Sequence, residues 1–304
     1  MTALLAAELR RAWSRRLVRV VAIAAFLVIA VAAILTAVNS HGPTEEQLAD
    51  ARLNYQANLE QCLSGAYLPE DQLPPGETMK EFCDDAVRLS SFLPNNEFHL
   101  FGLPDIISGA SILLILGAML LGASLVGAEW HAGTMTTLLT WETRRNRVLI
   151  AKTIAAAVVT FVLGIVLLAI LAGLLWFVAA TRGVTAGLPD GFWATVVGGV
   201  LRAGAAASFA SVIGFAIGMI GRNTAAAIGI GFAYFGVVEQ LIRGLRPAWQ
   251  PALLGENMAI FVSGTSSRLF ETLRTPSTAA IVVACYTAAL LAVAGLWFRA
   301  RDVN

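Results

Sequence analysis

Six long apolar runs constrain the fold of this 304-residue chain more than any other feature of its sequence. They occupy residues 18–38, 106–127, 150–179, 193–220, 224–242 and 279–298. A helix needs about 20 residues to cross the hydrocarbon core of a bilayer, so each run is long enough to span it. No run alternates as a strand does, and a lone segment in lipid satisfies its backbone hydrogen bonds only as a helix. The sequence therefore predicts an all-α membrane protein with six transmembrane helices.

The amino-acid composition indicates that much of the surface faces lipid. Hydrophobic residues make up 57% of the chain and charged residues 13%. Soluble globular domains carry about 25% charged residues. A nucleic-acid-binding protein shows a basic face, and this sequence has none. We expect the lipid bilayer as a partner, and no nucleic acid.

Arginine and lysine are unevenly distributed between the connecting segments. They are concentrated in residues 1–17, 128–149 and 299–304, whereas the longer segments 39–105 and 243–278 carry fewer per residue. Short cytoplasmic segments of membrane proteins collect these residues. The bias predicts a multi-pass protein of the plasma (inner) membrane with both termini in the cytoplasm.

Residues 1–17 precede the first span and have the pattern of an amphipathic helix. Leu5, Leu9 and Trp13 follow one another at intervals of four, while Glu8 and the arginines take the other faces. Such a helix lies in the membrane interface. The alternative is a signal peptide, although the apolar run that follows is longer than the usual 7–15 residues.

Residues 39–105 form the one sizeable polar segment, with twelve acidic and three basic residues. We expect a small extracytoplasmic helical cap, with helices around 45–63 and 77–93. Cys62 and Cys83 both lie here. Two cysteines in an extracytoplasmic loop predict a disulfide; the alternative is two unpaired buried thiols.

The second external segment, residues 243–278, is unusually apolar for an exposed loop. Two short helices that dip back toward the membrane would bury this surface, and a flat interfacial helix is the alternative. In the first case the segment is an external hairpin that acts as a gate. The expected gate residues are Leu254, Met258, Phe261 and Phe270.

Motifs for nucleotide hydrolysis and nucleophilic catalysis are missing from the sequence. Neither Lys80 nor Lys152 follows the glycine-rich spacing with which a P-loop holds phosphates, and no Gly-x-Ser-x-Gly elbow occurs. The three histidines are scattered, so no zinc site is suggested. We expect no catalytic residue, no metal and no ATPase site in this chain.

Two charged residues, Arg202 and Glu239, fall within the apolar runs. Charges inside a membrane are costly unless they pair or reach water, and they mark functional hypotheses. One hypothesis is an Arg202–Glu239 pair that faces a translocation cavity. The alternative is that each side chain extends to the interface or has another structural role.

Residues 128–149 form a polar elbow between the second and third spans. An acidic residue marks the end of the second span, a glycine permits a sharp change of direction, and a threonine can cap a short helix with an apolar side. An ordinary basic loop anchored to anionic lipid is the alternative. The residues that we expect to act here are Glu129, Gly133, Thr134, Leu138, Leu139, Arg144 and Arg145.

The run Glu129-x-x-x-Gly133-Thr134-x-x-x-Leu138-Leu139, followed by arginines and Lys152, resembles the first cytoplasmic loop of ABC-2 type transporter permeases. The resemblance implies that the elbow is a coupling helix, which docks in a groove on an ATP-binding subunit. Residues 2–16 resemble the family's connecting helix, and the two external segments and the basic ending at 298–302 fit as well. Many members carry a proline after the paired leucines, where this chain has Thr140.

The resemblance implies a permease half that works with a second permease subunit, identical or homologous, and with separate ATPase subunits that bind ATP and Mg. This chain itself would bind no cofactor. Its expected role is outward movement of an amphipathic substrate such as a drug or antibiotic, a lipid or a peptide. Two alternatives come from other classes: a membrane-anchored receptor or assembly factor that acts through the disulfide-linked cap, and a secondary transporter. A secondary transporter would show inverted repeats and several midplane charges, which this sequence lacks.

Overall fold

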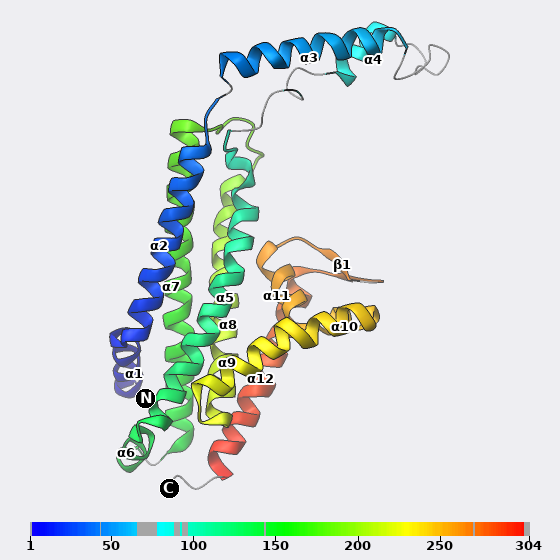
Figure 1. Cartoon of the computed structure of the whole chain (residues 1–304). Coiled ribbons are helices and arrows are strands. Elements are labelled where there is room, and N and C mark those ends of the chain that lie inside the picture. Colours follow the sequence, from blue (N-terminus) through cyan, green and yellow to red (C-terminus); the bar gives the residue numbers. More distant parts are fainter. Residues whose placement is uncertain are drawn as a thin grey trace. The chain divides into compact units, whose positions relative to one another are not determined.

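The computed structural model describes residues 2–42, 44–65, 78–87, 92, 97–142, 144–269 and 271–300. Within this part of the chain, six helices are long and apolar enough to cross a membrane (Figure 1), which confirms the all-α, six-span prediction. These spans are Arg16–Asn39, Leu100–His131, Arg145–Arg182, Phe192–Gly221, Thr224–Leu245 and Pro276–Ala300. The chain forms two compact units, described separately below.

The first unit comprises residues 1–33, 101–176 and 187–304. It holds most of the spanning helices, together with α1 and α6, which lie near the last turns of α12 at one end of the unit (Figure 1). We refer to this as the α6 end. Its helices are α1 (Thr2–Ser14), α2 (Arg16–Asn39, in part), α5 (Leu103–His131), α6 (Thr134–Trp141), α7 (Arg145–Arg182, in part), α8 (Phe192–Gly221), α9 (Thr224–Ala233), α10 (Glu239–Leu245), α11 (Leu254–Ser263) and α12 (Pro276–Ala300).

Helix α8 is the most buried span and packs most extensively against α5. Glycines allow the two backbones to approach closely. A Cβ atom on Gly122 of α5 would overlap the carbonyl of Ser211, and one on Gly214 of α8 would overlap the carbonyl of Met119. Small residues at membrane helix interfaces permit this kind of packing. The two helices therefore form the centre of the unit.

Helix α7 begins five residues before the expected span, at Arg145, and runs for 38 residues. Arginine is a good helix former, so the basic end of the elbow continues as the first turn of α7. At 1.5 Å per residue its length is about 57 Å, well beyond the hydrocarbon core of about 30 Å.

The segment 243–278 differs in part from the expectation of two short helices. A short 3₁₀ segment, Pro247–Ala252, leads into α11, which is one buried helix. The rest is an antiparallel pair of strands, β1 (Ser267–Leu269) and β2 (Thr272–Arg274). Gly264, at φ 73°, ends α11 in the left-handed region that favours glycine. Beyond it the expected second helix is replaced by strands, so that expectation is wrong.

The second unit comprises residues 34–100 and 177–186. Helix α3 (Glu45–Leu63) begins with a capping box, in which the Thr44 hydroxyl accepts from the Gln47 N–H and the Gln47 side chain accepts from the Thr44 N–H. A disulfide joins Cys62 to Cys83 in α4 (Met79–Ala86), as predicted. Both sulfurs are buried with Tyr55 and other apolar side chains. Much of the expected second helix at 77–93 lies outside the described residues.

Candidate functional site

Buried charges from three helices meet at the α6 end of the first unit. The Lys152 ammonium of α7 lies 2.6 Å from a Glu129 carboxylate oxygen of α5 and 2.9 Å from a Glu8 oxygen of α1. The Arg15 guanidinium lies 2.6 Å from the other Glu129 oxygen, and Arg11 lies 3.3 Å from Glu8. We call these five residues the charge cluster. It joins the N-terminal helix to the second and third spans.

The centre of the charge cluster is buried, whereas Arg11 at its edge has a side chain that is 51% exposed. Glu8 and Glu129 are each 6% exposed and Lys152 is 4% exposed. Removing one member of a buried ion pair leaves an uncompensated charge, which costs about 3–5 kcal/mol. Arg15 also donates to the carbonyls of Ser124 and Leu125. The cluster therefore fixes where α1 sits against α5 and α7.

This arrangement corrects the expected orientation of α1. Glu8 was expected on an outer face, but Glu8 and Ala12 are the buried residues of the helix. Leu5 and Leu9 are partly buried, and Trp13 is 43% exposed. Glu8 faces inward because Lys152 of α7 offers it a partner across the interface, while Arg10 and Arg11 stay exposed.

Sequence reasoning did not identify Glu8, Arg11, Arg15 and Lys152 as one site. A signal existed for part of it, because residues 8, 11 and 15 are spaced three and four apart and share a helix face. Lys152, one of only two lysines in the chain, gave no indication of its partners. Pairing across helices separated by more than a hundred residues depends on how the helices pack.

Helix α6 forms the elbow itself. Its N-cap is Gly133 at φ 67°, a left-handed conformation that allows the sharp reversal after α5. The expected cap by Thr134 is wrong: no side chain caps the helix, and the Thr134 hydroxyl donates to the Glu129 carbonyl at 3.4 Å. Met135 is fully buried. It packs with Val126, Leu149, Phe215 and Phe298, and Leu139 contacts the same cluster.

The opposite side of α6 is open. Trp141, the last residue of the helix, is 87% exposed, and Thr137 and Thr140 are also exposed, whereas Leu138 is partly buried. One face of the helix is thus anchored to the ends of α5, α7, α8 and α12, while the other presents a large aromatic side chain. Such rigid aromatic side chains are typical anchors of protein–protein interfaces.

The expected arginines at the elbow have different roles. Arg144 is exposed. Arg145 donates to the carbonyl of Phe298 at 2.9 Å, at the C-terminal end of α12. In addition, Arg299 donates to the Asn146 side chain at 2.6 Å. Arg145 therefore joins α7 to α12, and Arg144 is the basic residue left facing outward.

A cavity of about 570 Å³ lies between α5, the fifth span and α11. Its walls are largely apolar, and serine and threonine residues and Glu256, which pairs with Arg243 at 2.7 Å, are also among the lining residues. This combination suits a molecule with an apolar body and a few polar groups. Lining residues include Ser108, Ile112 and Ile115 from α5, Phe235 from the fifth span, and Glu256, Met258 and Ala259 from α11.

The structure places three of the four expected gate residues on α11. Leu254 and Met258 are buried at 5% and 2% exposure. Phe261 is partly buried, with its ring 6.4 Å from that of Phe209. Phe270 lies outside the described residues. Leu254 and Met258 pack against α5 and α8 residues in one apolar cluster, so α11 is part of the core rather than a surface helix.

The two intramembrane charges, Arg202 and Glu239, do not form the hypothesised pair, and the structure instead gives each a separate structural role, as in the alternative. Arg202 donates to carbonyls at the C-terminal end of α11, and Glu239 accepts from an amide at its N-terminal end. A helix of ten residues is about 15 Å long. The two charges are therefore held apart by α11, and each contacts backbone rather than the other charge.

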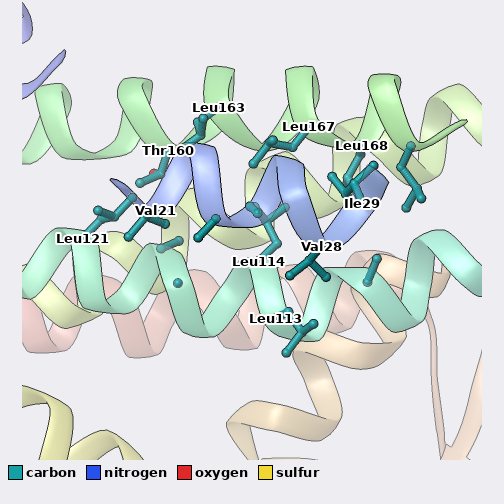
Figure 2. Close-up of a pocket in the computed structure, with 16 residues that line it drawn as sticks. Val21, Val28, Ile29, Leu113, Leu114, Leu121, Thr160, Leu163, Leu167 and Leu168 are labelled. Atoms are coloured by element: carbon teal, nitrogen blue, oxygen red, sulfur yellow. The ribbon is translucent and has the colours of Figure 1, made fainter. Parts of the chain in front are cut away.

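A second cavity, of about 300 Å³, lies between α2, α5 and α7 (Figure 2). Val21 and Val28 of α2, Leu114 of α5 and Leu163 of α7 surround it. Among the described residues that line it, Thr160 alone carries a side-chain hydroxyl, which donates to the carbonyl of Ala156. With no polar group left to bind, this cavity suits hydrocarbon and offers no partners to water.

Six helices long and apolar enough to span a bilayer define the chain as a polytopic membrane protein. The family described as ABC-2 family transporter protein matches residues 2–245. The chain belongs to this family. Its members are transmembrane subunits without an ATPase site of their own, and they typically partner with an ATP-binding subunit. No curated protein matches the sequence.

Proposed function

We propose that this chain is the permease subunit of an ATP-driven exporter in the plasma (inner) membrane, with both termini and α6 in the cytoplasm. A separate ATPase subunit, which binds ATP and Mg, docks on the exposed side of α6. A second permease subunit, identical or homologous, completes the translocation path. The observation that carries the proposal is α6 itself: a short helix, anchored on one side to four helix ends, with Trp141 exposed at 87% on the other.

The proposed coupling follows from the contacts of α6. Closure of the ATPase subunits around ATP displaces α6, and Met135 carries the displacement to α8 and α12. Through Glu129, the same displacement reaches α1 and α7. The glycine contacts between α5 and α8 make these helices move together. Coupling requires that the ATP-bound ATPase subunit bind one conformation of the spans more tightly than the other.

The proposed substrate is amphipathic and occupies the cavity between α5, the fifth span and α11. The walls of Phe235, Met258 and Ile112 accept an apolar body, and the serine and threonine residues of the lining accept polar groups. A drug-like compound, a lipid or a peptide has this chemistry. Opening of the α11 side releases the substrate outward.

The docking proposal is tested by co-purification with the ATPase subunit. Trp141→Ala removes an exposed aromatic anchor, and loss of such an anchor weakens binding roughly 30-fold or more. We expect loss of stoichiometric co-purification and of the ATPase activity that the permease stimulates. Trp249→Ala is the matched control, because Trp249 is also exposed, at 63%, but lies outside α6.

If Trp141→Ala co-purifies as well as the wild type, α6 is not the docking element. If the purified wild-type permease moves amphipathic dyes across vesicles without any ATPase subunit, the exporter proposal is wrong. The location of α6 is tested by labelling a cysteine at Thr137 with an impermeant maleimide in intact cells. Labelling there would place the elbow outside and contradict the proposal.

A further inference from the structure

The N-terminal end of α11 is held by side chains of the fifth span. The first amides of a helix have no intrahelical partner, and in a membrane no water replaces one. The Glu239 carboxylate accepts from the Gly255 N–H at 2.6 Å. The Tyr234 hydroxyl accepts from the Leu254 N–H at 3.4 Å. Glu239 is 2% exposed, so its negative charge is buried against this helix end.

The C-terminal end of α11 is held by the fourth span. Arg202 of α8 donates through Nε to the Val262 carbonyl at 3.2 Å and through Nη2 to the Ser263 carbonyl at 3.4 Å. These are two of the carbonyls that a helix leaves unpaired at its C-terminal end. A cation at this end and an anion at the other both match the helix dipole.

Glycines stand where the two charged groups reach the backbone. A Cβ on Gly255 would overlap the Glu239 carboxylate, and a Cβ on Gly264 would overlap the Arg202 guanidinium. Gly264 also has φ 73°, which disfavours other residues there. The close approach at each end of α11 therefore depends on the absence of a side chain.

We propose that Glu239 and Arg202 are positioning residues that hold α11 at its two ends and thereby set one wall of the transport cavity. Because Arg202 belongs to α8 and Glu239 to α10, a relative movement of these helices shifts α11. A π-helical turn, Tyr234–Val238, directly precedes Glu239, and such turns commonly occur at functional sites. The inference rests on the proposed function for its consequence in transport. The hold of Arg202 and Glu239 on the two ends of α11, which we call the clamp, can be measured without transport.

The test uses thiol labelling of α11 in the full-length protein. Val262→Cys introduces a thiol of similar size at a position that is 3% exposed, in a Cys285→Ser background that removes the free native cysteine. Arg202→Gln or Glu239→Gln leaves backbone groups at one helix end without their charged partner. Since an orphaned buried group shifts a local equilibrium by roughly five- to hundredfold, maleimide labelling should accelerate within that range.

The matched controls neutralise one arginine and one glutamate that follow α11 in the chain but do not contact its ends. Arg268→Gln and Glu271→Gln change exposed residues of the strand hairpin, so the labelling rate should stay within twofold of the parent. The conservative variants Arg202→Lys and Glu239→Asp keep the charge and should label at intermediate rates. They also keep the test usable if a glutamine variant fails to fold.

A charge reversal separates the clamp from a direct ion pair. In the double variant with Arg202→Glu and Glu239→Arg, a mutual pair would be restored and labelling would return toward the parental rate. If the clamp is correct, the double variant places a charge of the wrong sign at each end of α11. The rate of labelling should then exceed that of either single reversal. Recovery in the double variant would overturn the proposal, as would unchanged labelling in all Arg202 and Glu239 variants. Failure of the wild type to transport would instead count against the proposed function.

Discussion

At the scale of single residues, Lys152 is the residue that joins the helices at the α6 end. Its ammonium is shared by two carboxylates from two other helices. The sequence places Lys152 near the start of a span, but Glu8 is 144 residues away. Which helix faces meet is decided by packing of the apolar residues around the cluster, such as Ala12 and Val159. For this reason the partners of Lys152 could not be predicted, although its position could.

We predict that Lys152→Met destabilises the first unit. The substitution leaves Glu8 and Glu129 buried without the cation between them, at a cost of about 3–5 kcal/mol. The measurements are thermal unfolding in detergent and protease susceptibility of α1. Arg144→Met removes an exposed positive charge nearby and should change stability by less than about 0.5 kcal/mol.

A double variant checks that the effect comes from the charge and not from packing. Adding Glu8→Gln to Lys152→Met removes one of the uncompensated carboxylates. The double variant should therefore be less destabilised than the sum of the two single variants, because the residues are in contact. Strict additivity would show that the ion pairs contribute no coupling energy.

Arg202 and Glu239 show a second limit of sequence reasoning. That two intramembrane charges of opposite sign matter was readable from the sequence. Of the two hypotheses, mutual pairing is wrong in this structure, and a separate structural role for each charge is what the contacts show. The backbone groups at the two ends of α11 serve as the partners of these charges. Backbone groups are the same in every residue, so the sequence does not indicate which of them will bind a charged side chain.

At the scale of elements, the long apolar runs were predicted well because spanning a bilayer imposes both length and hydrophobicity. The sharp turn at the elbow was also predictable, from Gly133 and the change of polarity around it. Two features were not. The basic end of the elbow joins α7, and Ser267–Leu269 and Thr272–Arg274 form strands. Short segments beside a turn carry little periodic signal.

We predict that Gly122→Ala loosens the pairing of α5 with α8. The added methyl would meet the Ser211 carbonyl, and overpacking of this kind typically costs about 1–3 kcal/mol. Gly109→Ala, on the same helix, meets nothing within 4 Å and should be neutral or slightly stabilising, since alanine favours helix. The free energy of unfolding of the two variants, measured side by side, decides the question; equal values would contradict the proposed role of the glycine contacts.

At the scale of the whole molecule, topology followed from the spans and the family from the elbow motif. The family match ends at residue 245, before α11 and the last span. The change from an apolar to a polar, acidic composition after the first span indicated a separate polar segment, and most of that segment belongs to the second compact unit. The cysteine pair then indicated that the polar unit has its own covalent support, and the disulfide confirms this.

We predict that Cys62→Ser weakens the second unit selectively. The disulfide closes a short loop between cysteines 21 residues apart, and such a constraint contributes about 3 kcal/mol. Limited proteolysis should cut this unit faster in the variant while the cleavage rate of the first unit is unchanged. Cys285→Ser, which removes an unbonded thiol, should alter neither rate. Equal acceleration in both units would show that they unfold together.

Helix α5 carries α6 at one terminus, and residues 108–116 near its other terminus line the larger cavity. Its 29 residues make a rod about 43 Å long. If α5 pivots at its α6 end, the cavity-lining residues lie roughly 22–35 Å from the pivot, and a tilt of about 5° moves them by roughly 2–3 Å. This is comparable to the diameter of a water molecule, about 2.8 Å. In the proposed transport cycle, a displacement of α6 would therefore move this wall of the cavity through rotation of α5 as a rigid rod, without a bend in the helix.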